Sequence, residues 1–125
     1  MTFKDIKVLI CDDSVFARKK LKDFIISLGV SEVLEASDGQ EAVDKYLQNK
    51  PSVVFMDIIM PKKTGIDAVK EILAFDKSAK VVMASSVGTQ NYLKDAINAG
   101  AYEFLQKPIE NDLVMKILNN IIKEG

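Results

Sequence analysis

Three short apolar segments, separated by stretches with helical periodicity, constrain the fold of this chain more than any other feature. They span residues 6–11, 52–56 and 80–84, and each is an almost unbroken run of apolar, often β-branched residues. Runs of this kind are typical of strands buried on both faces of a parallel sheet. Two segments of mixed polarity, 32–35 and 102–105, are expected to be edge strands.

An amphipathic helical segment follows each expected strand, and each begins at a residue that can cap a helix. The expected caps are Ser14, Ser37, Thr64, Thr89 and Asn111. Apolar side chains expected to pack inward include Phe16, Tyr46, Leu47, Leu93, Ala96 and Ile97. Strands that alternate with helices predict an α/β fold, a doubly wound five-stranded parallel sheet with helices on both faces. We expect one domain over residues 1–125.

Composition excludes several classes of function. Charge is balanced, with 17 Lys and Arg against 18 Asp and Glu, so we expect no direct nucleic-acid binding. The chain has no histidine, which excludes a Ser-His-Asp or Cys-His nucleophile. It also excludes a phosphohistidine on this chain, so any phosphoryl donor must be another molecule. The single cysteine, Cys11, suits a reducing cytosol, and no apolar run approaches the roughly 18 residues of a membrane span. We therefore expect a cytoplasmic protein without membrane insertion.

Polar side chains gather where the expected strands end. They are Asp12 and Asp13 after the first strand, Asp57 after the third, Ser85 and Ser86 after the fourth, and Lys107 after the fifth. Ligands of open α/β sheets bind outside the carboxyl ends of the strands. The sequence therefore predicts a functional site at this edge.

Three carboxylates in one small cleft repel each other, and a hard divalent cation removes that conflict. With the metal bound, an aspartate can act as nucleophile and form an aspartyl phosphate. The metal and Lys107 can stabilise the charge of the transferred group, and Ser85 can donate its hydroxyl. Taken singly, these residues have ordinary interpretations as helix caps, loop aspartates, turn serines or a solvated lysine. Their shared position at the strand ends favours the functional interpretation.

These residues and their spacing resemble the response regulator receiver family over essentially the whole chain. The matching pieces are residues 11–14, 56–61, 85–86, 99–101 and 107–108, together with Gly65. The resemblance implies the strand order 2-1-3-4-5 of the flavodoxin-like and CheY-like (βα)5 folds. It also implies a phosphoprotein of a two-component system.

The resemblance assigns roles residue by residue. It implies that Asp57 is the phosphoacceptor and that Lys107 pairs with the phosphoryl group. The implied Mg²⁺ ligands are Asp12, Asp13, Asp57 and the backbone carbonyl of Ile59. The implied switch residues are Ser85 and Phe104. Asp13 is favoured over Asp12 as the direct ligand, and Mn²⁺ is the alternative ion. The bond between Lys107 and Pro108 is expected to be cis. For Phe104, a plain core or edge aromatic is the alternative.

The resemblance also implies partners. The phosphodonor is a histidine kinase, and a downstream protein binds the surface formed by the fourth helix, fifth strand and fifth helix. Residues 13–21 look like the corresponding segment of CheY-type chemotaxis regulators; the alternative is a receiver excised from a larger regulator with a DNA-binding output domain. We expect the protein to be a monomer, with phosphorylation-dependent dimerisation as the alternative. We expect it to act as a phosphoacceptor and not as a turnover enzyme.

Three rival functions stay open from the residues alone. A flavodoxin-like FMN binder would need a phosphate-binding loop after the first strand, where Asp12 and Asp13 repel phosphate. A phosphatase of the haloacid dehalogenase type uses Asp-x-Asp after its first strand, whereas these aspartates are adjacent. A degenerate receiver that serves only as a docking module typically lacks the acceptor or the metal-binding aspartates, and all are present here.

Overall fold

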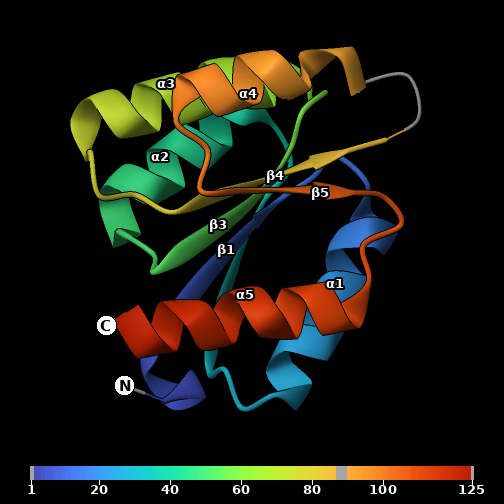
Figure 1. The fold of residues 1–125 in the computed structure, drawn as a ribbon, viewed down its shortest axis with the longest axis vertical. Coiled ribbons are helices and arrows are strands. Elements are labelled where there is room, and N and C mark those ends of the chain that lie inside the picture. The colour runs from blue at the N-terminus through green and yellow to red at the C-terminus, as the bar shows by residue number, and fades with distance from the viewer. Residues whose placement is uncertain (1, 87–89, 125) are drawn as a thin grey trace.

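The apolar runs form the centre of a parallel sheet in the computed structural model, which describes residues 2–86 and 90–124. The five strands lie in the order β2-β1-β3-β4-β5, as expected from the family resemblance (Figure 1). The strands are β1 (Lys7–Cys11), β2 (Glu32–Ala36), β3 (Val53–Asp57), β4 (Val81–Ser85) and β5 (Glu103–Gln106). β2 and β5 occupy the edges, as their mixed polarity predicts.

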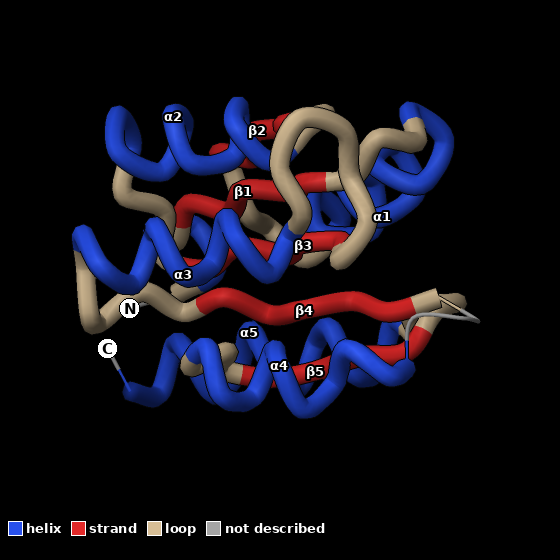
Figure 2. The backbone as a smooth tube through the Cα atoms, turned by 90° about the horizontal axis from the view of Figure 1, so that it is seen from above, coloured by secondary structure: helices blue, strands red, loops and turns tan. Residues whose placement is uncertain are grey.

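Five α-helices of the described residues cover the two faces of the sheet. They are α1 (Val15–Ser27), α2 (Gly39–Asn49), α3 (Gly65–Phe75), α4 (Leu93–Ala99) and α5 (Asn111–Glu124). Figure 1 shows α1 and α5 on one face of the sheet and α2, α3 and α4 on the other. Figure 2, seen from above, shows the strands side by side from β2 to β5. No helix in the described ranges is both long enough and apolar enough to cross a membrane.

Alternate residues of the central strands feed two separate cores. In β1, Leu9 and Cys11 pack in the core beneath α2, α3 and α4, whereas Val8 and Ile10 pack beneath α1 and α5. Successive side chains of a strand point to opposite faces, so a strand covered on both faces must be apolar throughout. This geometry explains why the sequence identified the three central strands so clearly.

The strands differ from the predicted ranges by about one residue. β3 and β4 each extend one residue further and end at Asp57 and Ser85. These two side chains are therefore held by the sheet ladder rather than by a loop, with Asp57 beside Ala84 in the register of β3 and β4.

The predicted caps of two helices are confirmed, and one is wrong. Ser14 and Thr64 accept hydrogen bonds from main-chain N–H groups in the first turns of α1 and α3. At α2 the cap is Asp38, whose carboxylate accepts from Glu41 N at 2.8 Å, and not Ser37. An aspartate is an equally good cap and stands one residue closer to the helix. The predicted cap Thr89 lies outside the described residues.

Four apolar side chains that were expected to pack inward are exposed instead. They are Phe16, Leu47, Leu93 and Ile97. Their neighbours Tyr46 in α2 and Ala96 in α4, which were also expected to pack inward, are buried as predicted. Adjacent positions on a helix lie about 100° apart, and here Leu47 and Ile97 stand outside the inward face on which Tyr46 and Ala96 lie.

The cap of α2 can be tested directly. Replacing Asp38 with Ala removes the acceptor for Glu41 N and should cost about 1 kcal/mol of stability. The thermal midpoint should then fall by about 4 °C, as followed by circular dichroism. Asp38→Asn, which keeps an acceptor, and Ser37→Ala should both unfold close to the wild type. A larger loss for Ser37→Ala than for Asp38→Ala would contradict this assignment.

Candidate functional site

The register of the sheet brings the polar strand ends together. Cys11 pairs with Met56, so Asp12 and Asp57 follow on neighbouring strands. Ser85, the last residue of β4, pairs with Gln106 at the end of β5, and Lys107 comes next. The Lys107 N–H donates to the Ser85 carbonyl at 2.7 Å, which extends the ladder to the lysine.

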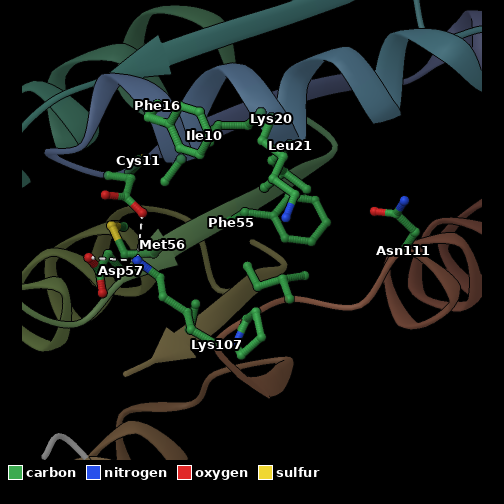
Figure 3. A pocket seen from close by; sticks show the side chains of 15 residues that line it. Ile10, Cys11, Phe16, Lys20, Leu21, Phe55, Met56, Asp57, Lys107 and Asn111 are labelled. Carbon is green, nitrogen blue, oxygen red and sulfur yellow. Dashed lines mark hydrogen bonds and ion pairs between the residues drawn. The ribbon is translucent and has the colours of Figure 1, made fainter. Parts of the chain in front are cut away.

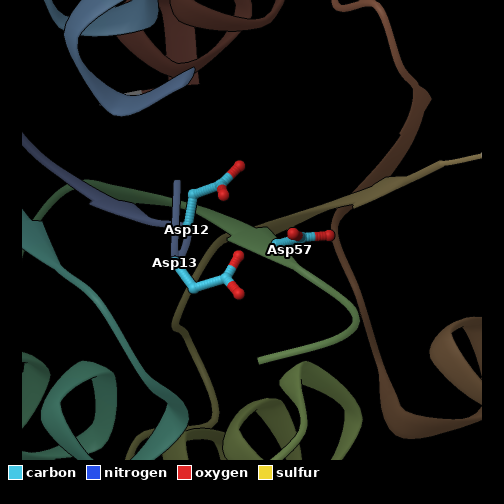
Figure 4. Close-up of side chains that lie close together, drawn as sticks. All are labelled: Asp12, Asp13 and Asp57. Carbon is cyan, nitrogen blue, oxygen red and sulfur yellow. The ribbon is translucent and has the colours of Figure 1, made fainter. Parts of the chain in front are cut away.

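Three carboxylates converge at this edge (Figure 4). Asp12, Asp13 and Asp57 each offer one oxygen, and these oxygens all lie within 4.8 Å of one another. Asp12 is buried, Asp13 is exposed, and the Asp57 side chain is 12% exposed. The group is therefore closed on one side and open on the other, and its donor set suits a hard divalent cation that keeps part of its water shell.

Lys107 crosses the edge of the sheet and joins two of the carboxylates. Its ammonium nitrogen lies 2.7 Å from Asp12 Oδ2 and 3.1 Å from Asp57 Oδ2 (Figure 3). The peptide bond between Lys107 and Pro108 is cis, as expected. The ammonium thus offsets part of the negative charge that the carboxylates gather.

The three carboxylates and the Lys107 ammonium together carry an excess of negative charge when all are ionised. Burial raises the pKa of Asp57, and the Asp12 carboxylate adds to the rise; Lys107 opposes both without cancelling them. Burial alone would lower the pKa of Lys107, but its bonds to Asp12 and Asp57 outweigh it and raise that pKa. The lysine is therefore held charged, while Asp57 ionises less readily than an ordinary aspartate. A second cation would favour its ionised form.

Ser85 and Phe104 lie in different environments. Ser85 is completely buried, and its hydroxyl oxygen has no hydrogen-bond partner among the residues that the structure describes. A buried hydroxyl without a partner is costly and uncommon. Phe104 is half-buried and packs against the core beneath α2, α3 and α4.

The loop after Asp57 is held against the start of α3. Gly65 N donates to the Ile58 carbonyl at 2.7 Å, and Ile58 N donates to the Ala84 carbonyl at 3.3 Å. The Ile59 side chain points to solvent and is 48% exposed. A Cβ added at Gly65 would lie 2.0 Å from the Asp57 carbonyl oxygen, so only glycine allows this close approach.

A cavity of about 190 Å³ opens beside the acidic cluster, between α1 and the start of α5. Its walls are largely apolar, and Asp12 is among the residues that line it. Asp57 and Lys107 lie together at one end (Figure 3). The exposed ring of Phe16 contributes to its rim. The cavity is continuous with the candidate site.

The sequence interpretation missed Arg18 and Glu35. The Arg18 guanidinium donates to the Asp12 carbonyl at 2.6 Å and to Glu35 at 3.1 Å. A long cation one turn into α1 and an acidic residue within an edge strand are each unremarkable in a sequence. Only the packing of α1 against β2 brings them together at the site.

Comparison with known proteins agrees with this geometry. The model of the response regulator receiver domain matches residues 8–119. The chain is 45% identical to the chemotaxis protein CheY of Thermotoga maritima over 117 residues, covering 94% of this chain and 98% of the relative. It is 41% identical to CheY of Bacillus subtilis over 116 residues, covering 93% and 97%.

A solved structure is similar as well. The CheX-CheY-BeF3-Mg complex of Borrelia burgdorferi contains a chain that superposes on this one with a TM-score of 0.85. The two are 38% identical, and the match covers 94% of this chain and 89% of the other.

The close approach at Gly65 predicts the effect of a single methyl group. Helix propensity alone favours Gly65→Ala, but the added Cβ would collide with the Asp57 carbonyl and displace the backbone. We expect a loss of about 1–3 kcal/mol in chemical unfolding, typical of overpacking. Lys70→Ala, at an exposed position of α3, should be nearly neutral. A more stable Gly65→Ala protein would contradict the contact.

The raised pKa of Asp57 predicts that the metal-free protein is stabilised by Asp57→Asn. The ionised carboxylate is disfavoured in the fold, so at neutral pH the variant should unfold a few degrees higher in the presence of a chelator. Because the wild-type carboxyl takes up its proton as pH falls through its raised folded pKa, the gain should fade in acid. The control is Asp44→Asn, at an exposed position of α2, which should leave the unfolding temperature nearly unchanged. A gain that grows toward acid would overturn the assignment.

Proposed function

This chain belongs to the response regulator receiver family, and from that membership we propose that it accepts a phosphoryl group on Asp57 from a phosphohistidine of a partner kinase. The observation that carries the proposal is the contact of the Lys107 ammonium with Asp57, within a cluster of three carboxylates at the end of the sheet. Asp57 is thereby placed beside a fixed positive charge and beside a candidate cation site.

The acceptor carboxylate performs the bond-forming step. An Asp57 oxygen attacks the phosphorus atom, the bond from phosphorus to the donor's imidazole nitrogen breaks, and the electron pair leaves with the imidazole. Lys107 stays charged throughout, which its raised pKa favours, and pairs with the phosphoryl oxygens. The chain acts as acceptor in this transfer and not as a turnover enzyme.

The metal is Mg²⁺, with Mn²⁺ as a substitute. The residues that would hold it are Asp12, Asp13, Asp57 and the Ile59 carbonyl, and the three carboxylates fit a divalent cation in number, kind and spacing. When bound, Mg²⁺ neutralises part of their charge and polarises the phosphoryl group. Because Lys107 already occupies one oxygen of Asp12, Asp13 is the more open ligand.

Ser85 and Phe104 form the proposed switch. The new phosphoryl oxygens give the buried Ser85 hydroxyl the acceptor it lacks in the described structure. Movement of Ser85 toward them vacates space for Phe104, which packs from β5 against the core beneath α4. The change reaches the surface of α4, β5 and α5, where we propose that a downstream protein binds.

The setting of this switch is proposed from the relatives. The relatives from Thermotoga maritima and Bacillus subtilis are chemotaxis proteins CheY, and the similar solved chain comes from a complex with CheX. We therefore propose a cytoplasmic chemotaxis regulator that receives its phosphoryl group from a histidine kinase. We propose that the protein is a monomer before phosphorylation. We also propose that it neither binds nucleic acid directly nor inserts into a membrane.

The proposed acceptor can be identified by intact mass. The protein is incubated with acetyl phosphate or phosphoramidate, with and without Mg²⁺, beside Asp57→Asn and the exposed control Asp44→Asn. We expect one added phosphoryl group that requires Mg²⁺, persists in Asp44→Asn and disappears in Asp57→Asn. An equal modification of Asp57→Asn, or none in the wild type, would refute the assignment.

A further inference from the structure

All four polar atoms of Asp12 are engaged. Its N–H donates to the Ala36 carbonyl at 3.0 Å, and its Oδ1 accepts from Ser14 N at 2.9 Å. Its Oδ2 accepts from Lys107 at 2.7 Å. Its main-chain carbonyl accepts from Arg18 Nη1 at 2.6 Å. Asp12 is therefore fixed by β2, α1 and the residue after β5 at once.

Asp13 is held in a different way. Among the described residues, none donates a hydrogen bond to its carboxylate, which nevertheless points toward the same region as the other two (Figure 4). Its direction is therefore set by its main chain. The carbonyl of Asp12 belongs to the peptide unit that joins Asp12 to Asp13, so the Arg18 bond fixes the plane from which the Asp13 side chain departs.

Arg18 is itself firmly anchored. Its side chain is 13% exposed, and its Nε donates to Glu35 Oε1 at 3.1 Å. The other oxygen of Glu35 accepts from Lys22 at 3.2 Å, and the Glu35 carbonyl accepts from the Lys45 ammonium. Burial alone would raise the pKa of Glu35, but these bonds from Lys22 and Arg18 outweigh it and lower that pKa, so the anchor stays ionised.

We propose that Arg18 is a positioning residue for the metal site: it ties the Asp12–Asp13 peptide to Glu35 on β2 and so directs the Asp13 carboxylate toward the cation. The inference rests on the proposed function, since it concerns the same carboxylates. The planar guanidinium suits the task because its donors lie in a rigid fork with fixed directions, whereas a lysine ammonium is a compact charge on a flexible stem.

Positioning and charge predict opposite effects. Arg18 carries a positive charge near a cation site, so Coulomb repulsion alone predicts that its removal tightens metal binding. If Arg18 directs Asp13, its removal weakens metal binding instead. Partners that orient metal ligands typically change affinity by about 10–100-fold when they are removed.

The experiment measures Mn²⁺ affinity by titration, with the concentration of free Mn²⁺ followed by electron paramagnetic resonance and no phosphoryl donor present. The proteins are wild type, Arg18→Met, Arg18→Lys and Lys19→Met. Lys19→Met removes the same charge from the adjacent residue, whose ammonium pairs with Asp23 at the surface. We expect about 10-fold weaker binding for both Arg18 variants, and wild-type or slightly tighter binding for Lys19→Met. Arg18→Lys keeps the charge and the aliphatic stem, and metal-free melting by circular dichroism reports on its fold.

Two outcomes overturn different claims. Wild-type protein that binds no Mn²⁺ would overturn the proposed metal site, and this inference with it. Wild-type binding that is matched by both Arg18 variants would overturn the positioning role alone.

A double-mutant cycle tests the anchor. Glu35→Ala should weaken Mn²⁺ binding in the wild-type background and add little in Arg18→Met, because Glu35 acts through Arg18. An equal effect in both backgrounds would contradict a path from β2 through Arg18 to Asp13.

Discussion

The meeting of like charges at the carboxyl edge of the parallel sheet is the constraint on which the rest of this structure depends. Asp12, Asp13 and Asp57 are brought within 4.8 Å by the strand order and register, which apolar burial decides. Lys107 offsets part of that repulsion from beyond β5. The sheet therefore holds together groups that would separate in a flexible chain. Burial above all, and then the Asp12 charge, raise the pKa of Asp57 at this edge.

The residues around this edge serve the fold and the proposed chemistry together. Lys107 is a counterion in the metal-free protein and the proposed partner of the phosphoryl group. Gly65 lets α3 start against the Asp57 carbonyl, and Arg18 fixes the peptide after β1. Ser85 is the exception, because its buried hydroxyl has no hydrogen-bond partner among the described residues. A local cost of this kind is expected where a site is built for a ligand that is not always present.

Sequence patterns predicted the central strands because burial on both faces leaves a continuous apolar run, and they predicted the edge strands from mixed polarity. They predicted helix faces less well, since Tyr46 and Leu47 are both apolar neighbours and only packing selects the inward one. The gathering of Asp12, Asp57 and Lys107 followed from topology, whereas their precise roles rested on the family resemblance. Arg18 and Glu35 were missed because their contact is made across α1 and β2, far apart in sequence.

The most direct test of the account is a crystal structure of the protein with Mg²⁺ and beryllium trifluoride, a mimic of the phosphoryl group. We predict the mimic on an Asp57 oxygen, Mg²⁺ among the three carboxylates, Lys107 paired with one fluoride, and the Ser85 hydroxyl donating to another fluoride. A mimic bound elsewhere, or an occupied Asp57 with Ser85 still unpartnered, would contradict the claim that this edge is built around a phosphorylated aspartate.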